Sequence, residues 1–411
     1  MKYRIITALL CCVLWVPGSL AATPLTLGEA IARVLEHNPR LQAADYDARA
    51  AAQRIRQQEQ APPMDLGLDV GNIGLGGNRL ETTLSLGRVL ELGDKAGKRG
   101  VVATLEAGLL RHEQDAQRLD LLVEVARRFL AIMRVQHERD LAEQRVELIQ
   151  GTLNAVQRRH AVGKAAAAEV NRVQIDLVRA ELGLEESEQR LNNGRRALAV
   201  LWGAFEPDFE QVQASLFKLE AVPAFATLDA RIEANPDLVR LATLQRLGKA
   251  RQQLAQARVR SNLEWQAGLR HFNDTDDLAL QFSVRVPLGS RRRAEAYITE
   301  AEALAAREPL LANEQRLALR NTLSSLHQEM RHARQRYAAY QSRILPAAEQ
   351  ALTEYSQGYA SGRYTLVELN SMQQTLLDSH HEILLAAIDH HAARIEIERL
   401  IGGIPHIGAN Q

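Results

Sequence analysis

Histidines are the residues in this chain that most readily suggest a metal site. They include two doublets, His380-His381 and His390-His391. Adjacent residues on a helix point about 100° apart, and His380 and His391 share a face but lie about 16 Å apart along it. Neither spacing brings ligands close enough together for a compact metal site. We therefore interpret these histidines as structural or solvated and predict no metal site.

No other residue pattern indicates catalysis. The sequence has no Ser-His-Asp arrangement, zinc-protease motif or glycine-rich phosphate loop in a suitable context. It carries 50 Lys and Arg against 50 Asp and Glu, so its charge gives no reason to expect nucleic-acid binding. We predict a protein that is not an enzyme and that uses no cofactor.

Two glutamates occupy matching positions beside glycines. Glu169 follows Gly163 by six residues, and Glu368 follows Gly362 by six. We predict helical hairpin turns at these glycines, where positive φ is favourable. Around a lumen shared by several chains, each glutamate would form an acidic ring that attracts cations and can gate passage, and Tyr359 lies close enough to join this gate. The alternative is that both acids only stabilise helix N-termini.

The same glycines reveal an internal repeat. They are 199 residues apart. Seven further residues of the first half have an identical residue 199 positions later, namely Ala161, Glu169, Asn171, Gln174, Leu177, Leu201 and Gly203. The two halves also begin alike, with Asn38-Pro39 in the first and Asn235-Pro236 in the second. A duplicated unit must bury its face against its sibling or against other chains, so we expect the function to belong to an assembly.

Residues 1–21 have the features of a secretory signal peptide. Lys2 and Arg4 precede an apolar run that is too short to span a bilayer, and small residues precede the cleavage site. Cleavage leaves 48 Lys and Arg against 50 Asp and Glu, a net charge of −2, and removes both cysteines. No later stretch is apolar enough for a membrane helix. We predict an exported protein, which must use strands if it spans a membrane.

Each half is predicted to contain a short helical lead, two strands and two long helices. The first half, 22–202, has strands within 65–90 and long helices at 94–158 and 166–202. The second half, 227–402, has strands within 262–288 and long helices at 290–357 and 365–401. Residues 203–226 connect the halves, and 403–411 form a tail. A helix of about 65 residues reaches about 100 Å, which indicates a coiled coil or the wall of a barrel.

The predicted strands alternate apolar and polar residues. In the second half, one face would carry Leu263, Trp265, Leu269, Leu280, Phe282 and Val284. This pattern is typical of an outer-membrane barrel with lipid outside and water inside, although a half-buried sheet in a soluble domain has the same period. The export signal and the long helices favour the membrane. Four strands cannot close a barrel, since the smallest need about eight, so several chains must pool their strands.

The order of these elements resembles the TolC-type outer-membrane efflux family over essentially the whole mature chain. Two strand-to-helix junctions carry the resemblance, at residues 90–99 and 286–293. The first looks especially like the "EL-G-GKR" stretch of the heavy-metal branch typified by CzcC, from which Asp94-Lys95-Ala96 depart.

The resemblance implies a mainly α fold with a small membrane β-barrel part, in which a duplicated unit of long antiparallel coiled-coil helices carries four strands per chain. Three chains would form an α/β barrel duct in the outer membrane of a Gram-negative bacterium, extending into the periplasm. The duct would be the passive channel of a tripartite efflux system, with a periplasmic adaptor (membrane fusion) protein and an inner-membrane pump of the RND type. The expected substrates are heavy-metal cations. The alternatives are a duct for drugs or for type I protein secretion, or a soluble periplasmic coiled-coil adaptor, which would have one hairpin and no paired strands.

The resemblance also assigns adaptor docking to the tips of the two hairpins, at Arg159, Gly163, Lys164, Gly362 and Arg363. Family loops often read Arg-x-x-x-Gly-Leu with a Ser two positions later. Here Lys164 replaces the Leu and Ala166 replaces the Ser, so the sequence does not imply a drug-efflux adaptor.

The run Arg291-Arg292-Arg293 could suggest phosphate binding. Because it directly follows a strand, it indicates a membrane interface, with head-group or lipopolysaccharide contacts.

Overall fold

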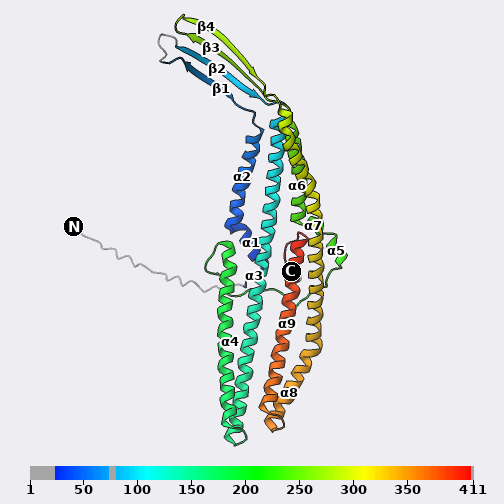
Figure 1. Cartoon of the computed structure of the whole chain (residues 1–411). Helices are drawn as coiled ribbons and strands as arrows, with labels where there is room; N and C mark the ends of the chain where they lie inside the picture. The colour runs from blue at the N-terminus through cyan, green and yellow to red at the C-terminus, as the bar shows by residue number, and fades with distance from the viewer. Residues whose placement is uncertain (1–23, 74–79, 409–411) are drawn as a thin grey trace, which may run out of the picture.

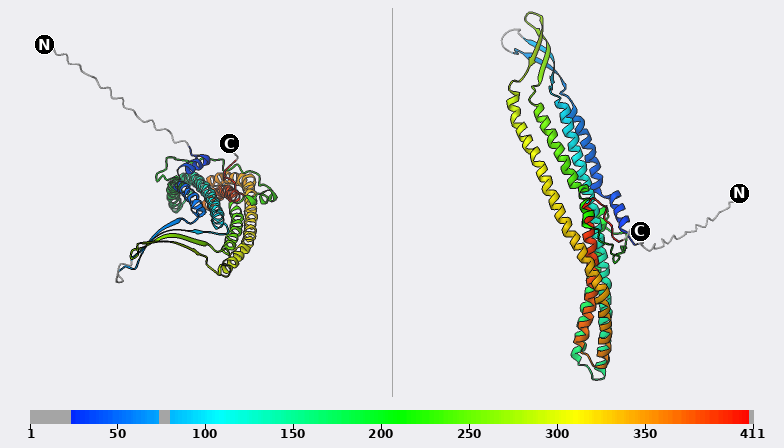
Figure 2. Two further views of the ribbon diagram at one scale, coloured as in Figure 1. Left: turned by 90° about the horizontal axis from the view of Figure 1, so that it is seen from above. Right: turned by 90° about the vertical axis from the view of Figure 1, so that its right-hand side faces the viewer.

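The computed structural model describes residues 24–73 and 80–408. The predicted signal peptide lies outside the described residues, as does the predicted turn between the first two strands. The molecule is a long bundle of helices with a four-stranded sheet at one end (Figure 1). Viewed along the bundle, the sheet curves to one side of the helices (Figure 2).

The two halves contain the same long elements. The first half comprises α1 (Leu27–His37), α2 (Pro39–Glu59), β1 (Met64–Gly71), β2 (Glu81–Leu90), α3 (Lys95–Ala161), α4 (Ala167–Ala199) and η1 (Val200–Trp202). The second comprises α5 (Phe225–Asp229), η2 (Ile232–Ala234), α6 (Pro236–Ala257), β3 (Leu263–Phe272), β4 (Asp277–Arg285), α7 (Ser290–Ala339), η3 (Tyr340–Ile344), α8 (Leu345–Ser361) and α9 (Leu366–Leu400). The predicted strands and long helices are present, with boundaries displaced by a few residues.

An asparagine caps the first long helix of each half, α2 or α6, and makes corresponding hydrogen bonds in both halves. The Asn38 side chain accepts the Arg40 N–H at 2.9 Å and caps α2, and Asn235 caps α6 by accepting the Asp237 N–H at 2.8 Å. Each side-chain amide also donates to a carbonyl at the end of the return helix, Asn38 to Leu201 at 2.7 Å and Asn235 to Leu400 at 3.0 Å. The repeat read from the sequence is therefore a structural repeat with equivalent hydrogen bonds.

The second half departs from the prediction in the long helix that runs from the sheet to the hairpin tip. We predicted one helix over 290–357, but α7 passes through the π turn η3 into α8, which continues to Ser361. Pro346 lies in the first turn of α8 and has no N–H to donate to the preceding turn, which accounts for the local change in hydrogen bonding. The corresponding helix of the first half, α3, runs without interruption for 67 residues.

The sheet is antiparallel throughout, with strand order β1-β2-β3-β4. Its register aligns apolar residues across all four strands. One row contains Leu68, Leu84, Leu269 and Leu280, and the next contains Leu66, Leu86, Ala267 and Phe282. Most of these side chains are exposed, and Leu280 reaches 91%. The sheet therefore presents one continuous apolar face to its surroundings.

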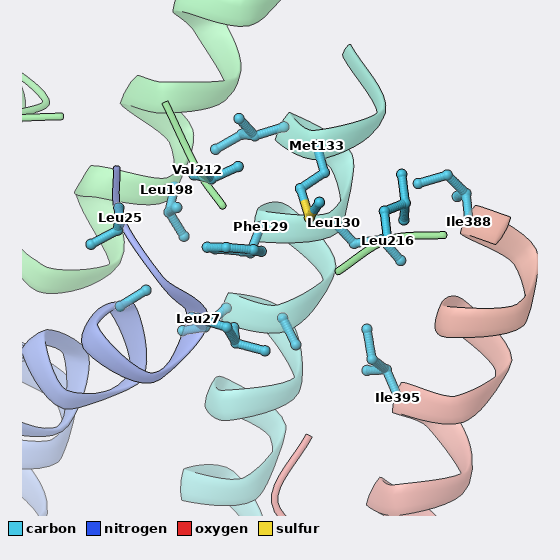
Figure 3. Close-up of a cluster of buried hydrophobic side chains, with 14 of the residues drawn as sticks. Leu25, Leu27, Phe129, Leu130, Met133, Leu198, Val212, Leu216, Ile388 and Ile395 are labelled. Atoms are coloured by element: carbon cyan, nitrogen blue, oxygen red, sulfur yellow. The ribbon is translucent and has the colours of Figure 1, made fainter. Parts of the chain in front are cut away.

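The main core lies midway along the helices, where they meet the connector. Phe129 of α3 is fully buried there, beside Leu198 of α4 and Leu25 (Figure 3). The connector contributes Val212, which forms an isolated bridge with Leu25, and Leu216. Among the residues that the structure describes, no helix has both the length and the apolar content needed to cross a membrane.

Candidate functional site: the hairpin tips and the sheet

The two hairpin tips use the same turn. Gly163 and Gly362 have φ values of +70° and +84°, in the left-handed region that glycine tolerates best. The Lys164 N–H donates to the Arg159 carbonyl at 2.8 Å, and the Arg363 N–H donates to the Gly358 carbonyl at 2.8 Å. The structure therefore places all five predicted docking residues at one end of the molecule, far from the sheet (Figure 1).

Arg159 links the two hairpins within one chain. Its guanidinium lies over the Tyr359 ring, 4.6 Å from the centroid, and donates a hydrogen bond to the Tyr359 carbonyl. A second bond reaches the Lys164 carbonyl at 3.4 Å. Apolar packing surrounds this contact, from Leu153, Val156, Val173, Leu366 and Leu369. A cation over an aromatic face and a charged hydrogen bond both stabilise the contact between the two hairpins.

Tyr359, which we predicted to join a lumen gate, is buried within its own chain. Its side chain is only 3% exposed and packs between the two hairpins. This burial raises the pKa of Tyr359 above its usual value, so the phenol stays protonated near neutral pH. Its contribution is to hold the hairpins together, because helix packing turns its ring inward.

The two predicted gate glutamates lie in the first turns of the return helices. The Glu368 carboxylate accepts the Thr365 N–H at 2.8 Å and the Thr365 hydroxyl at 2.8 Å, in a capping box. These bonds, backbone first, lower the pKa of Glu368. Glu169 accepts the Ala166 N–H at 3.4 Å. Both acids thus stabilise helix N-termini, and this does not prevent them from facing a lumen in an assembly.

One requirement of the second tip was missed in the sequence. A Cβ built on Gly358 would lie 2.0 Å from the Tyr364 ring, which in turn packs on Tyr355 with 4.4 Å between centroids. A side chain at position 358 would displace this aromatic pair. The clustering of Tyr355, Tyr359 and Tyr364 around a glycine is the signal that could have revealed it.

The opposite faces of the sheet have opposite chemistry. All six residues predicted to face lipid lie on the apolar face, since they alternate on β3 and β4 and pair in the same rows. The other face is polar and internally bonded. Arg270 donates to Thr83 at 3.1 Å, to Glu81 at 3.3 Å and to Gln281 at 3.0 Å. The alternation predicted from the sequence therefore corresponds to two physically distinct faces.

The histidine doublets lie on α9, with His390 and His391 fully buried. The His391 ring contacts the Leu216 carbonyl at 2.8 Å and so ties α9 to the connector. In the part of the chain that the structure describes, no group of three or more His, Cys, Asp or Glu residues is placed to hold a metal ion.

Comparison with known proteins identifies the family. Residues 30–204 match the model of the outer membrane efflux protein family. The chain is 25% identical over 389 residues to the cobalt-zinc-cadmium resistance protein CzcC of Cupriavidus metallidurans, covering 93% of this chain and 91% of that protein. The chain belongs to the outer membrane efflux protein family.

Solved structures share the fold across nearly the whole chain. CusC, described in connection with folding and transmembrane channel formation, superposes with a TM-score of 0.78 at 14% identity, covering 93% of each chain. The outer membrane protein VceC of Vibrio cholerae gives 0.74 at 17% identity, covering 92% of this chain and 97% of VceC. MtrE of Neisseria gonorrhoeae, an outer membrane channel in its open state, gives 0.74 at 16% identity, covering 94% and 91%. This outer membrane efflux protein therefore shares the fold of these outer-membrane proteins over nearly its whole length.

Proposed function

We propose that this outer membrane efflux protein conducts heavy-metal cations to the cell exterior as the passive channel of a tripartite efflux system. A periplasmic adaptor and an inner-membrane pump, of the RND type, would deliver the cations. The main support is the similarity to CzcC, a cobalt-zinc-cadmium resistance protein, over 93% of this chain.

The charge of the polar sheet face favours cations. In its paired segments this face carries five carboxylates, Asp65, Asp69, Glu81, Glu264 and Asp277, against two guanidiniums, Arg270 and Arg285. Arg270 pairs with Glu81 and Arg285 pairs with Glu264, each at 3.3 Å. In the described part of the chain, the three aspartates have no ion-pair partner. If this face lines a lumen, the net negative charge attracts cations and repels anions.

The open edges of the sheet support assembly into a trimer. β1 and β4 are the outer strands, and each is paired on one side only. An unpaired edge in lipid costs several kcal/mol per backbone group. Pairing β4 of one chain with β1 of the next removes these edges, and three chains would supply twelve strands. The apolar face then contacts outer-membrane lipid, while the helices extend into the periplasm.

The hairpin tips are the proposed docking surface for the adaptor. Val162, Gly163 and Lys164 are exposed at the first tip, and Gly362 and Arg363 at the second. Both tips present backbone turns of the same geometry at the end remote from the sheet, which an adaptor could recognise together.

The experiment that tests the function is deletion and complementation in the source bacterium. The deletion strain should accumulate zinc, cobalt or cadmium, measured by elemental analysis of washed cells, and should grow poorly on these metals. The intact gene should restore both properties. Sensitisation to a panel of drugs with unchanged metal content would instead support the alternative, a drug channel.

A further inference from the structure

The two strand-to-helix junctions occupy equivalent places in the repeat but use their cations differently. The first junction carries Lys95, Lys98 and Arg99, and the second carries Arg291, Arg292 and Arg293. Both lie where the sheet meets the helices (Figure 1). At the first junction the bonded cations have a structural role, whereas at the second junction the cations are available to an external partner.

Two of the three cations of the first junction, Lys95 and Arg99, are bonded within the protein. The Lys95 ammonium donates to the Arg260 carbonyl at 2.7 Å, just beyond the end of α6. The Arg99 guanidinium pairs with Glu91 at 2.7 Å and donates to the carbonyls of Gln58 and Gln60 at the end of α2. These two side chains satisfy carbonyls left without partners where helices end.

The cations of the second junction are bonded within the protein much less. Arg291, Arg292 and Arg293 are all exposed, and in the described part of the chain none forms an ion pair. The one side-chain hydrogen bond described for them runs from the Arg293 guanidinium to the Leu288 carbonyl at 3.4 Å. Leu288 itself is 89% exposed, and the neighbouring Val286 is also exposed. Three exposed guanidiniums without an ion pair in the described part of the chain thus adjoin an exposed apolar segment.

This segment continues the apolar face of the sheet. Val284 lies in the row nearest the junction, where it pairs with Trp265 and where Arg88 is the one charged residue, and Val286 and Leu288 follow it along the chain. Moving from the sheet toward the helices, the surface therefore changes from apolar to cationic within about ten residues. That order matches a bilayer leaflet, where acyl chains give way to phosphate head groups.

We propose that residues 286–293 bind the head groups of anionic phospholipids in the periplasm-facing leaflet of the outer membrane. Leu288 inserts among the acyl chains, and the arginines donate to phosphate oxygens, which the guanidinium fork fits in a bidentate manner. This inference rests on the proposed function, because it requires the sheet to lie in the membrane. Lipopolysaccharide belongs to the opposite leaflet, beyond the hairpin end of the sheet, so the proposed ligand is a phospholipid.

Trp265 provides a built-in probe for the test. It lies in the apolar row next to the junction, whereas Trp202 is buried in the helical core and Trp15 belongs to the predicted signal peptide. The full-length protein would be reconstituted in vesicles containing brominated phosphatidylglycerol or brominated phosphatidylcholine. Contact quenching of Trp265 by each lipid then gives the relative binding constant of the anionic lipid.

The variant Arg291→Gln/Arg292→Gln/Arg293→Gln should lose the preference for phosphatidylglycerol. Adjacent helix positions point about 100° apart, so at most two of the three can share one lipid. At about fivefold for each arginine near the surface, the relative binding constant should fall about fivefold to twenty-five-fold. Arg331→Gln/Arg334→Gln/Arg343→Gln is the matched control, since these exposed arginines of α7 and η3 also lack ion pairs in the described part and lie far from the sheet.

Each possible result decides between the ideas. Equal preference in the wild type and the junction variant would overturn the lipid site. Loss of the oligomer in that variant, independent of lipid composition, would also overturn it, because the arginines would then contact a neighbouring subunit. If neither brominated lipid quenches Trp265 in the wild type, the proposed membrane-spanning sheet itself is wrong.

Discussion

At the scale of single residues, Arg159 is the side chain that holds the two hairpins of one chain together. Arg159→Met removes the bond to the Tyr359 carbonyl and the contact with the Tyr359 ring, a loss of about 2–3 kcal/mol at the tip. We expect looser tips and a larger single-channel conductance in planar bilayers. Arg158→Met is the control, since Arg158 is exposed and forms no ion pair within the described residues. Equal conductance of both variants would show that this contact does not restrict the tip.

The proposed gate glutamates require a separate test, because their capping bonds explain them without any lumen. Glu169→Gln together with Glu368→Gln keeps an acceptor at each helix N-terminus and removes both charges. If the glutamates line the duct, the double variant should show lower cation conductance or leak in bilayer recordings. Conductance identical to the wild type would leave only the capping role.

His390 should make stability depend on pH. It is fully buried without a hydrogen-bond partner among the described residues, and its charged neighbours are Arg394 on α9 and Arg334 on α7, while His391 adjoins it. Burial above all, followed by these neighbours, lowers the pKa of His390 from 6.5 to about 4. Between pH 4 and pH 6.5, His390 is therefore largely protonated in the unfolded chain and largely neutral in the folded chain. The folded state is favoured above pH 6.5 and loses about 3 kcal/mol as the pH falls toward 4.

His390→Leu should accordingly flatten the fall in melting temperature between pH 7 and pH 4.5, as measured by calorimetry of the detergent-extracted protein. His332→Leu, at an exposed position on α7, is the control and should keep the wild-type slope. A slope unchanged by His390→Leu would mean that other groups control acid sensitivity.

At the scale of elements, the sheet separates its two faces so clearly that charge selectivity can be tested on one strand. Asp65 and Asp69 lie exposed on the polar face of β1 and have no ion-pair partner within the described residues. Asp65→Asn/Asp69→Asn removes two negative charges per chain without changing side-chain size. The reversal potential in a salt gradient should move toward that of a non-selective pore. An unchanged reversal potential would place cation selection elsewhere.

Local patterns predicted these elements because their causes are local. Alternation in Leu278, Leu280 and Phe282 defines a strand face whatever its partners, and Asn-Pro defines a helix start. The burial of Tyr359 could not be predicted in this way, because it depends on two hairpins whose residues are 200 positions apart. The π turn before Pro346 was also missed, since hydrophobic spacing continues through it. The bridge of Leu25 to Val212 is equally non-local.

At the scale of the whole molecule, a shared membrane barrel makes two neighbouring residues of β4 respond differently to the same substitution. Leu280 is on the apolar face and Gln281 on the polar face, and both are exposed in the single chain. Leu280→Arg would place a charge in lipid at a cost of about 2–4 kcal/mol for each chain, and a trimer carries three copies. Gln281→Arg would face water and should be tolerated.

The measurement is the fraction of each variant recovered from the outer membrane as an oligomer in mild detergent, with a mass three times that of the mature chain for the wild type. Leu280→Arg should reduce this fraction strongly, and Gln281→Arg should leave it near the wild-type value. Because both substitutions introduce an arginine at adjacent positions, general effects of an added arginine on expression cancel. Equal recovery of the two variants would mean that the apolar face does not contact lipid, and the channel would then lack the wall on which conduction depends.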